Sequence, residues 1–278
     1  MTKKMQFNVV RMNTPEVNYL DIYHYLLKIS WVQLFFFYIL FFMGINFVYA
    51  CIYWMVPGSL SENASEFKDA FFFSVQTFST VGYGTISPHS LFGNIVVVLE
   101  IMTGVVSVAI TTGLVFAKFS RPSAKILFTK NLLLTKYDGV DVLMFRMANI
   151  RSNQIISANV ELHYLYNTTT VEGQKIVRFL PLKLQKNYSP LFSLSWSVFH
   201  TVDQESPLFG KTLEEIIQSK IEFMVILNGT DGTFSQTIYD MHYYNVTDIV
   251  FDKHFSDILT RLEDGTRVIN YENFHETI

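Results

Sequence analysis

The chain carries little charge and a single cysteine. Charged residues make up 16% of its 278 residues and hydrophobic residues 50%, which are respectively low and high for a soluble protein. Because Cys51 has no second cysteine to pair with, no disulfide can form within the chain. The net charge of −3 gives no sign of a polyanionic partner, so a nucleic-acid-binding function is not predicted.

Several functional motifs are also missing. No G-x-G-x-x-G follows a predicted strand, which disfavours a dinucleotide-binding Rossmann domain. No helix repeats arginine as a voltage sensor does. His200, Asp203 and Ser206 are close in sequence, but a hydrolase triad requires an oriented geometry that proximity along the chain does not show. Enzymatic activity is therefore not predicted.

Two long apolar segments are present instead. The first, residues 31–56, has no charge and is long enough to span about 30 Å of hydrocarbon. Trp31 and Trp54 lie near its two ends, where aromatic anchors are expected. The second, Leu91–Phe119, carries one charge before Lys118. The sequence thus predicts an outer and an inner transmembrane helix. Residues 21–28, just before them, fit either a short helix along the membrane surface or a plain linker.

A glycine-rich motif, Thr80-Val81-Gly82-Tyr83-Gly84, lies between these spans. The apolar segment before it, 67–79, is too short to cross a membrane and predicts a re-entrant helix, which is tolerated where it lines a water-filled path. Two glycines around one aromatic residue let the backbone run extended with successive carbonyls turned to one side. A ring of such loops replaces the hydration shell of K⁺. The motif therefore predicts a potassium-selective filter.

The inner span predicts the wall of a pore. Stepping by four from its one internal charge gives a face that we expect to line the pore, composed of Glu100, Gly104, Val108, Thr112 and Phe116. An ionisable residue inside a span is functional by default, although a surface carboxylate reaching the interface is the alternative for Glu100. The bulky Phe116 is predicted to gate the path by dewetting; the alternative is that it packs against lipid.

Basic residues flank the two spans on one side. Lys28 precedes the first span, and Lys118 and Arg121 follow the second, whereas the loop between the spans is mainly acidic. The positive-inside rule then places both termini in the cytoplasm. The same basic residues also suit anionic lipid head groups, and topology alone explains them equally well.

Beyond Pro122 the pattern changes to short alternating segments separated by turn signals such as Asp138-Gly139 and Asp264-Gly265. This spacing predicts an antiparallel β-sandwich. Residues 212–220 form one helix-like interruption. The expected strands are Ala124–Leu134, Val142–Arg146, Asn159–Tyr166, Ile176–Leu184, Leu191–Phe199, Phe223–Leu227, Gly232–Tyr239 and Thr266–Tyr271.

Four motifs together resemble the inward rectifier potassium channels, most closely their prokaryotic branch. They are the filter, Phe116–Pro122, Arg146–Arg151 and His200–Leu208, and the resemblance extends from about residue 19 to 277. It implies an immunoglobulin-like cytoplasmic domain and a homotetramer. By position, Thr80 to Gly84 would coordinate K⁺, and Lys28, Lys118 and Arg121 would bind lipid, including phosphoinositides. The implied cytoplasmic constriction comprises Gly229, Thr230, Asp231, Gly232, Thr233 and Phe234.

The chain also departs from this family. Val108 stands where strong rectifiers have an acidic residue, so weak rectification is expected. Gln76 and Ile86 replace the ion pair that braces the filter in eukaryotic members, and Glu100 is a candidate to brace it instead.

These observations predict an α+β membrane protein with three parts. Residues 1–29 form a cytoplasmic N-terminus with an interfacial helix, 30–121 a pore domain, and 122–278 a cytoplasmic β-sandwich. The predicted function is a lipid-modulated K⁺ channel of a bacterial inner membrane, with no cofactor besides K⁺ in the filter. A non-conducting, membrane-anchored β-domain that senses or binds a partner is the alternative.

Overall fold

The computed structural model describes residues 22–278 except 65, 121–123, 220, 262 and 266. The chain divides between residues 121 and 122 into two compact units, one helical and one built of β-strands.

The helical unit contains four helices, α1 (Ile22–Lys28), α2 (Trp31–Met55), α3 (Phe67–Phe78) and α4 (Leu91–Phe119). Local sequence sets where the long helices begin. The Ser30 and Gln33 side chains cap α2 reciprocally, and Ser90 Oγ accepts a hydrogen bond from Gly93 N at 3.1 Å to open α4. Both α2 and α4 are long and apolar enough to cross a membrane, with mean hydropathies of 2.1 and 2.2.

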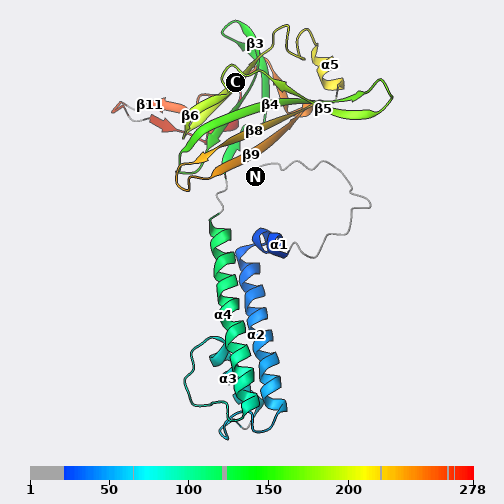
Figure 1. Ribbon diagram of the computed structural model, residues 1–278. Coiled ribbons are helices and arrows are strands. Elements are labelled where there is room, and N and C mark those ends of the chain that lie inside the picture. The colour runs from blue at the N-terminus through cyan, green and yellow to red at the C-terminus, as the bar shows by residue number, and fades with distance from the viewer. Residues whose placement is uncertain (1–21, 65, 121–123, 220, 262, 266) are drawn as a thin grey trace. The chain divides into compact units, whose positions relative to one another are not determined.

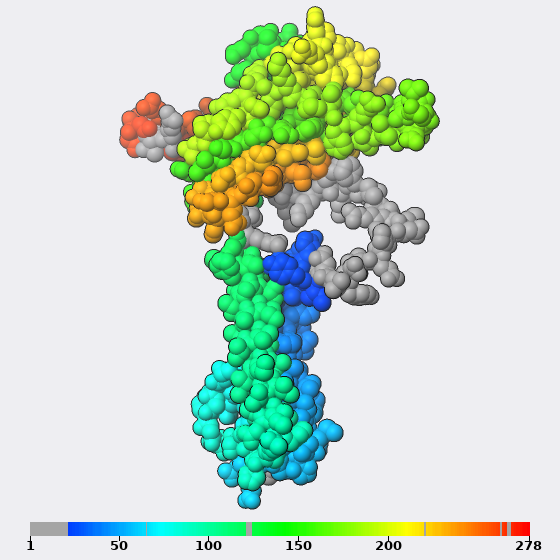
Figure 2. All heavy atoms as spheres, viewed as in Figure 1, coloured from blue at the N-terminus to red at the C-terminus, as the bar shows by residue number. Residues whose placement is uncertain are grey.

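The short helix α3 packs between α2 and α4 at one end of this unit (Figure 1). A small core, which includes Ala50 and Tyr53 of α2, Phe73 of α3 and Val96 of α4, joins the three helices. Along the rest of α4, large apolar side chains remain exposed on the single chain. The atoms of α4 extend along the length of this unit in Figure 2. The observed helix bounds differ from the predicted ones by at most one residue.

The second unit is a sandwich of two five-stranded sheets. In the first sheet β1 (Ile126–Phe128), β3 (Val140–Asn149), β2 (Leu132–Tyr137) and β10 (Ile249–Phe251) lie in that order, and β7 (Ser195–Thr201) also pairs with β3. In the second the order is β5 (Lys175–Leu182), β4 (Ile155–Thr169), β8 (Glu222–Asp231) and β9 (Thr237–Asn245), and β6 (Tyr188–Phe192) pairs with β4. A further hairpin joins β11 (Leu259–Arg261) to β12 (Arg267–Ile269).

The core of the sandwich lies between the inner faces of the two sheets. Fully buried side chains such as Phe145 and Met147 of β3 meet Val160 of β4 and Phe223 of β8. The helix α5 (Leu213–Gln218) adds Ile216 to this core. The predicted architecture of two membrane-length helices, a short helix between them and a β-rich domain is confirmed.

Some predicted strands were wrong in detail. The segment 191–199 is two strands in different sheets, because the chain turns at Ser193 and Leu194. The segment 124–134 is likewise divided between β1 and β2. Residues 232–236 form a turn instead of the start of a strand, because the Asp231 carboxylate accepts hydrogen bonds from the N–H groups of Thr233 and Phe234. Of the turn signals, Asp138-Gly139 does form a two-residue hairpin, with φ of 48° and 79°.

Candidate functional site

The motif 80–84 directly follows the C-terminus of α3. Helix ends leave carbonyl groups without intrahelical partners, and here these carbonyls hold the start of the motif. Thr80 N donates to Thr77 O at 3.0 Å, and Val81 N and Gly82 N donate to Gln76 O at 2.8 and 3.3 Å. The short helix therefore fixes the direction in which the motif leaves it.

Within the motif, every second residue has a left-handed backbone. Thr80, Gly82 and Gly84 have φ of 59°, 55° and 80°, whereas Val81 and Tyr83 do not have positive φ. Alternation of this kind turns successive carbonyl groups to the same side of the chain. No donor from the described residues approaches the carbonyl oxygens of 80–84. Thr80 adopts a conformation that a β-branched residue rarely takes, so the surrounding structure must hold it there.

A buried polar cluster lies behind α3. Glu100 of α4 is fully buried, and its carboxylate accepts hydrogen bonds from Ser74 Oγ of α3 and, at 2.6 Å, from Tyr53 Oη of α2. Ser74 Oγ also lies 3.0 Å from Oδ1 of Asn46, whose Nδ2 donates to Phe42 O at 2.7 Å. No lysine or arginine of the described chain forms an ion pair with Glu100. The carboxylate therefore ties the helix that carries the motif to both long helices.

Gly104, one helical turn beyond Glu100, allows α4 to touch the end of α3. A Cβ atom at this position would overlap the carbonyl group of Phe78, the last residue of α3. The absence of a side chain is therefore required by close approach between backbones. Together, Glu100 and Gly104 form a continuous contact from the middle of α3 to its C-terminus.

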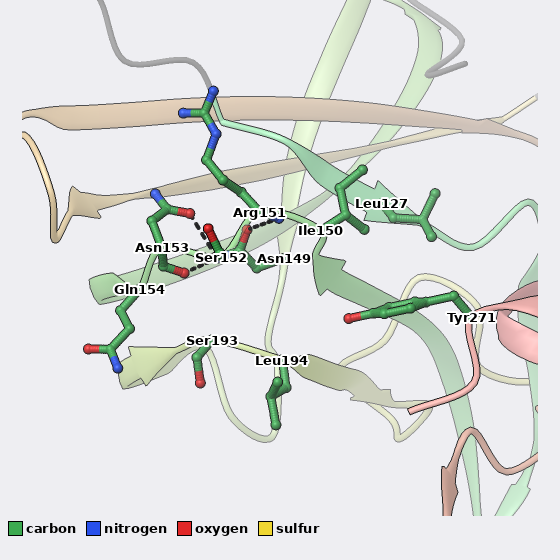
Figure 3. A pocket seen from close by; sticks show the side chains of 10 residues that line it. All are labelled: Leu127, Asn149, Ile150, Arg151, Ser152, Asn153, Gln154, Ser193, Leu194 and Tyr271. Carbon is green, nitrogen blue, oxygen red and sulfur yellow. Dashed lines mark hydrogen bonds between the residues drawn. The ribbon is translucent and has the colours of Figure 1, made fainter. Parts of the chain in front are cut away.

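The loop 229–234, the predicted constriction, consists of the last three residues of β8 and the first three residues of the turn that leads to β9. Asp231 is fully buried, and Oδ1 accepts hydrogen bonds from Thr233 N at 2.7 Å and Phe234 N at 3.2 Å. Its Oδ2 accepts one from Asn153 Nδ2 at 2.6 Å, and Gly232 N donates to Gln154 O at 2.8 Å. Asp231 thus shapes the loop internally and attaches it to the turn between β3 and β4 (Figure 3).

Comparison with known proteins identifies the family. Residues 126–278, more than half of the chain, match the model described as "Inward rectifier potassium channel C-terminal domain", and residues 37–121 match the model described as "Ion channel". The chain belongs to the inward rectifier potassium channel family. The predicted resemblance is confirmed, and the chain is a membrane protein.

Two relatives illustrate the extent of the similarity. The inward rectifier potassium channel Kirbac3.1 of Paramagnetospirillum magnetotacticum is 37% identical over 272 residues, covering 97% of this chain and 92% of that protein. The human G protein-activated inward rectifier potassium channel 3 is 27% identical over 299 residues, covering 97% of this chain and 75% of that protein. Similarity to this inward rectifier family therefore includes both units.

The predicted pore-lining face of the inner helix needs correction. Glu100 and Gly104 are buried against α3 inside the subunit, whereas Val108, Thr112 and Phe116 are exposed on the single chain. An α-helix advances about 100° per residue, so each step of four residues drifts by about 40°. Over the four steps from Glu100 to Phe116 the drift reaches about 160°, which places these two residues on nearly opposite faces. Pore lining by Val108 and Thr112 and gating by Phe116 stay predictions.

The described basic residues near the membrane ends have different surroundings. Lys118 Nζ donates hydrogen bonds to Leu27 O, at 3.0 Å, and to Ile29 O, and it lies 5.5 Å from the Trp31 ring centroid. It therefore joins the end of α4 to the junction of α1 and α2. Lys28 is exposed. Arg121, the third predicted lipid ligand, lies outside the described residues.

The group formed by His200, Asp203 and Ser206 does not have the geometry of a hydrolase triad. His200 is buried, Nδ1 donates to Lys183 O at 2.8 Å, and Nε2 accepts from Ser206 Oγ at 2.9 Å. The Asp203 carboxylate accepts from Glu205 N, and it does not orient the imidazole. Burial lowers the pKa of His200, so the ring is a neutral part of the domain core.

Sequence reasoning missed the two partners of Glu100, Tyr53 and Ser74, and it missed Asn46, which contacts Ser74. A signal was present for Asn46, because an amide inside a membrane span commonly hydrogen-bonds to a neighbouring helix. Ser74 gave a weaker signal, and nothing in the sequence distinguished Tyr53 from the other tyrosines of the outer span.

Proposed function

We propose that the chain assembles into a homotetrameric, K⁺-selective pore of the inward rectifier type. One chain contributes one loop, and a ring of carbonyl oxygens around an ion requires several symmetry-related copies. The observation that carries this proposal is the backbone of 80–84, with its alternating conformation and with carbonyl oxygens that no donor of the described chain approaches. In the pore these oxygens coordinate K⁺, assisted by the Thr80 hydroxyl.

The remaining assignments follow from this arrangement. Phe116 closes the path near one end of α4, and Val108 and Thr112 line it. Because Val108 brings no carboxylate to the path, rectification is weak. The loop 229–234 forms a second constriction in a cytoplasmic domain. Anionic lipids, phosphoinositides among them, modulate gating from the cytoplasmic leaflet through the basic residues at Lys28 and Arg121. We place the channel in a bacterial inner membrane with both termini in the cytoplasm.

Uptake of radioactive Rb⁺ into liposomes tests the proposal. Wild-type chain and Gly82→Ala are compared with and without anionic lipid. Alanine at φ 55° carries a penalty of about 1–2 kcal/mol in the left-handed region, so the variant should lose uptake. Uptake by the wild type that Gly82→Ala abolishes supports the filter, and equal uptake by both, above that of empty liposomes, refutes it.

A closed channel must be distinguished from a protein that does not conduct. Phe116→Ala removes the proposed constriction and should raise uptake if the pore is closed. Background uptake by both the wild type and Phe116→Ala, across several lipid compositions, would favour a membrane-anchored β-domain that binds a partner without conducting. Phe119→Ala, at an equally exposed phenylalanine at the end of α4, is the control for the same loss of a ring and the same change in helix propensity.

A further inference from the structure

One amide side chain of α2 is completely enclosed within the helical unit. Asn46 lies near the middle of this apolar helix and has no exposed surface. A polar side chain inside a membrane span is costly unless it is hydrogen-bonded, and such residues commonly bond to a neighbouring helix or serve the function. The surroundings of Asn46 therefore indicate what it does.

The orientation of this amide is determined by its two partners. Asn46 Nδ2 donates to Phe42 O, one turn earlier in α2, at 2.7 Å. Because a carbonyl oxygen only accepts, the amide nitrogen must face Phe42, and Oδ1 must face Ser74 Oγ, which lies 3.0 Å away on α3. Asn46 thus presents a hydrogen-bond acceptor to the short helix that carries the motif 80–84.

Ser74 lies between acceptors on two different helices. Its hydroxyl has one proton, and both Asn46 Oδ1 of α2 and the Glu100 carboxyl group of α4 are within hydrogen-bonding distance. The proton can serve either acceptor, so α3 is held from the side of α2 as well as from the side of α4. Without the amide, Ser74 would donate to Glu100 alone.

A second contact between α2 and α3 lies one helical turn closer to the motif. The Phe42 ring packs edge-to-face against the Phe78 ring, with their centroids 5.5 Å apart. Phe78 is buried and is the last residue of α3. Residues four apart share one face of a helix, so Phe42 and Asn46 of α2 meet Phe78 and Ser74 of α3 as two adjacent contacts, one aromatic and one polar.

The segment of α3 between these contacts holds the start of the motif. Gln76 O accepts hydrogen bonds from the N–H groups of residues 81 and 82, and Thr77 O accepts one from Thr80 N. Both carbonyl groups lie between Ser74 and Phe78 in the sequence. A displacement of this segment would therefore move the first three residues of the motif.

We propose that Asn46 is a positioning residue for ion selection, which fixes α3 through Ser74 and thereby sets the placement of the carbonyl oxygens of 80–84. The inference rests on the proposed function, because it assumes that these oxygens bind K⁺. Asn46 does not touch the ion, and its effect passes through the Ser74 hydroxyl.

Competition between Rb⁺ and Na⁺ for uptake into liposomes tests this role. Asn46→Leu replaces the amide by an apolar side chain of similar size. It should reduce the preference for Rb⁺ over Na⁺ by about threefold, the equilibrium equivalent of one hydrogen bond between membrane helices. Asn46→Ala, which also lacks the acceptor, should reduce it in the same direction. A loss with leucine that alanine does not share would arise from the fit of leucine and overturns the proposal.

Asn94→Leu is the matched control. Asn94 Nδ2 donates to Ser90 O, four residues earlier in α4, at 2.9 Å, as Asn46 Nδ2 does to Phe42 O. The Asn94 side chain is exposed, and the described chain offers it no hydrogen bond to another helix. Asn94→Leu should therefore leave the preference unchanged. An equal loss in Asn94→Leu and Asn46→Leu overturns the proposal.

A double-mutant cycle tests whether Asn46 acts through Ser74. Ser74→Ala removes the hydroxyl, after which Asn46→Leu should not change the Rb⁺ preference further. If Asn46→Leu causes the same loss with and without the Ser74 hydroxyl, Asn46 acts by packing alone, and the proposal is overturned.

The free energy of unfolding is measured on the same preparations. A merely structural role would lower the stability of Asn46→Leu and leave the Rb⁺ preference of the folded channel unchanged, and this outcome overturns the inference alone. Absence of Rb⁺ uptake by the wild type and by Phe116→Ala refutes the proposed function and the inference with it.

Discussion

Two tyrosines of α2, one helical turn apart, provide a quantitative test of the cluster around Glu100. Tyr53 Oη donates to the buried Glu100 carboxylate at 2.6 Å. Tyr49 Oη lies 2.8 Å from Thr103 Oγ1, which is exposed and also donates to Leu99 O at 2.6 Å. Substitution by phenylalanine removes one hydroxyl in each case and keeps the ring, so the two variants differ mainly in whether the acceptor is a buried carboxyl group or an exposed hydroxyl.

The expected magnitudes differ for this reason. Leaving a buried hydrogen-bonding group without its partner costs about 1–3 kcal/mol, so Tyr53→Phe should lower the free energy of unfolding by about 2 kcal/mol. Neutral hydrogen bonds between membrane helices average about 0.6 kcal/mol, which is the loss expected for Tyr49→Phe. The difference of about 1.4 kcal/mol corresponds to a factor of about ten in the unfolding equilibrium.

The assay is reversible unfolding of the full chain in mixed micelles, followed by tryptophan fluorescence. Repeating Tyr53→Phe in a Glu100→Gln background isolates the interaction, because an amide then replaces the carboxyl acceptor and the loss should fall below about 1 kcal/mol. Rb⁺ uptake in competition with Na⁺ measures selectivity in the same variants, and Tyr53→Phe should reduce it more than Tyr49→Phe does. Equal losses of stability in the two tyrosine variants, or an unchanged loss in the Glu100→Gln background, would refute the reasoning.

Three further outcomes are expected. Gly104→Ala should lower the free energy of unfolding by about 1–3 kcal/mol, because the added Cβ overlaps the Phe78 carbonyl. Gly113→Ala should not lower it, because no atom lies within 4 Å of the added Cβ. Thermal unfolding compares the two variants, and equal midpoints would contradict the close packing at Gly104. Lys118 donates hydrogen bonds to the carbonyl oxygens of Leu27 and Ile29, so Lys118→Met should speed amide hydrogen exchange in α1. Lys118→Arg and Lys28→Met, a substitution at an exposed lysine, are the controls. Identical exchange rates in all three variants would exclude a role for the hydrogen bonds of Lys118. Burial lowers the pKa of folded His200 below the unfolded value of about 6.5, so the unfolded state binds more protons in this range. The free energy of unfolding should therefore fall as the pH drops below about 6.5, and it should fall less in His200→Gln. A free energy of unfolding that does not change with pH in this range would contradict the expectation.

The membrane unit was largely predictable from the sequence, because length without charge and a five-residue motif leave few alternatives. The helix bounds of α2, α3 and α4 follow from residues such as Ser30 and Ser90, whose capping role is local. The faces of α4 were less predictable. Residues spaced four apart from Glu100 share one face of the helix only over a short distance. The angular drift then accumulates along α4 and separates the buried end of the series from its exposed end.

The sandwich was predictable as a class but not in its strand order. Hairpins with local turn signals, such as the one at Asp138-Gly139, follow from the chain itself. The division at Ser193 and Leu194 depends on which sheet each flanking strand joins, and pairing with distant β4 or β3 leaves no local signal. The same limitation applies to the Asn153–Asp231 contact, whose two residues are 78 positions apart.

Gly104 and Gly113, two of the three glycines of α4, have different surroundings and divide the inner helix into mechanically distinct parts. Gly104 is wedged against the last carbonyl of α3, so a bend there would pull directly on the motif 80–84. Gly113 has nothing beside it within 4 Å, and the helix can flex at that point without touching α3. Bending at Gly113 would therefore move the segment that carries Phe116 without disturbing the contact between Gly104 and α3. If Phe116 gates the path as proposed, the gate would move on a hinge that is separate from the support of the loop 80–84.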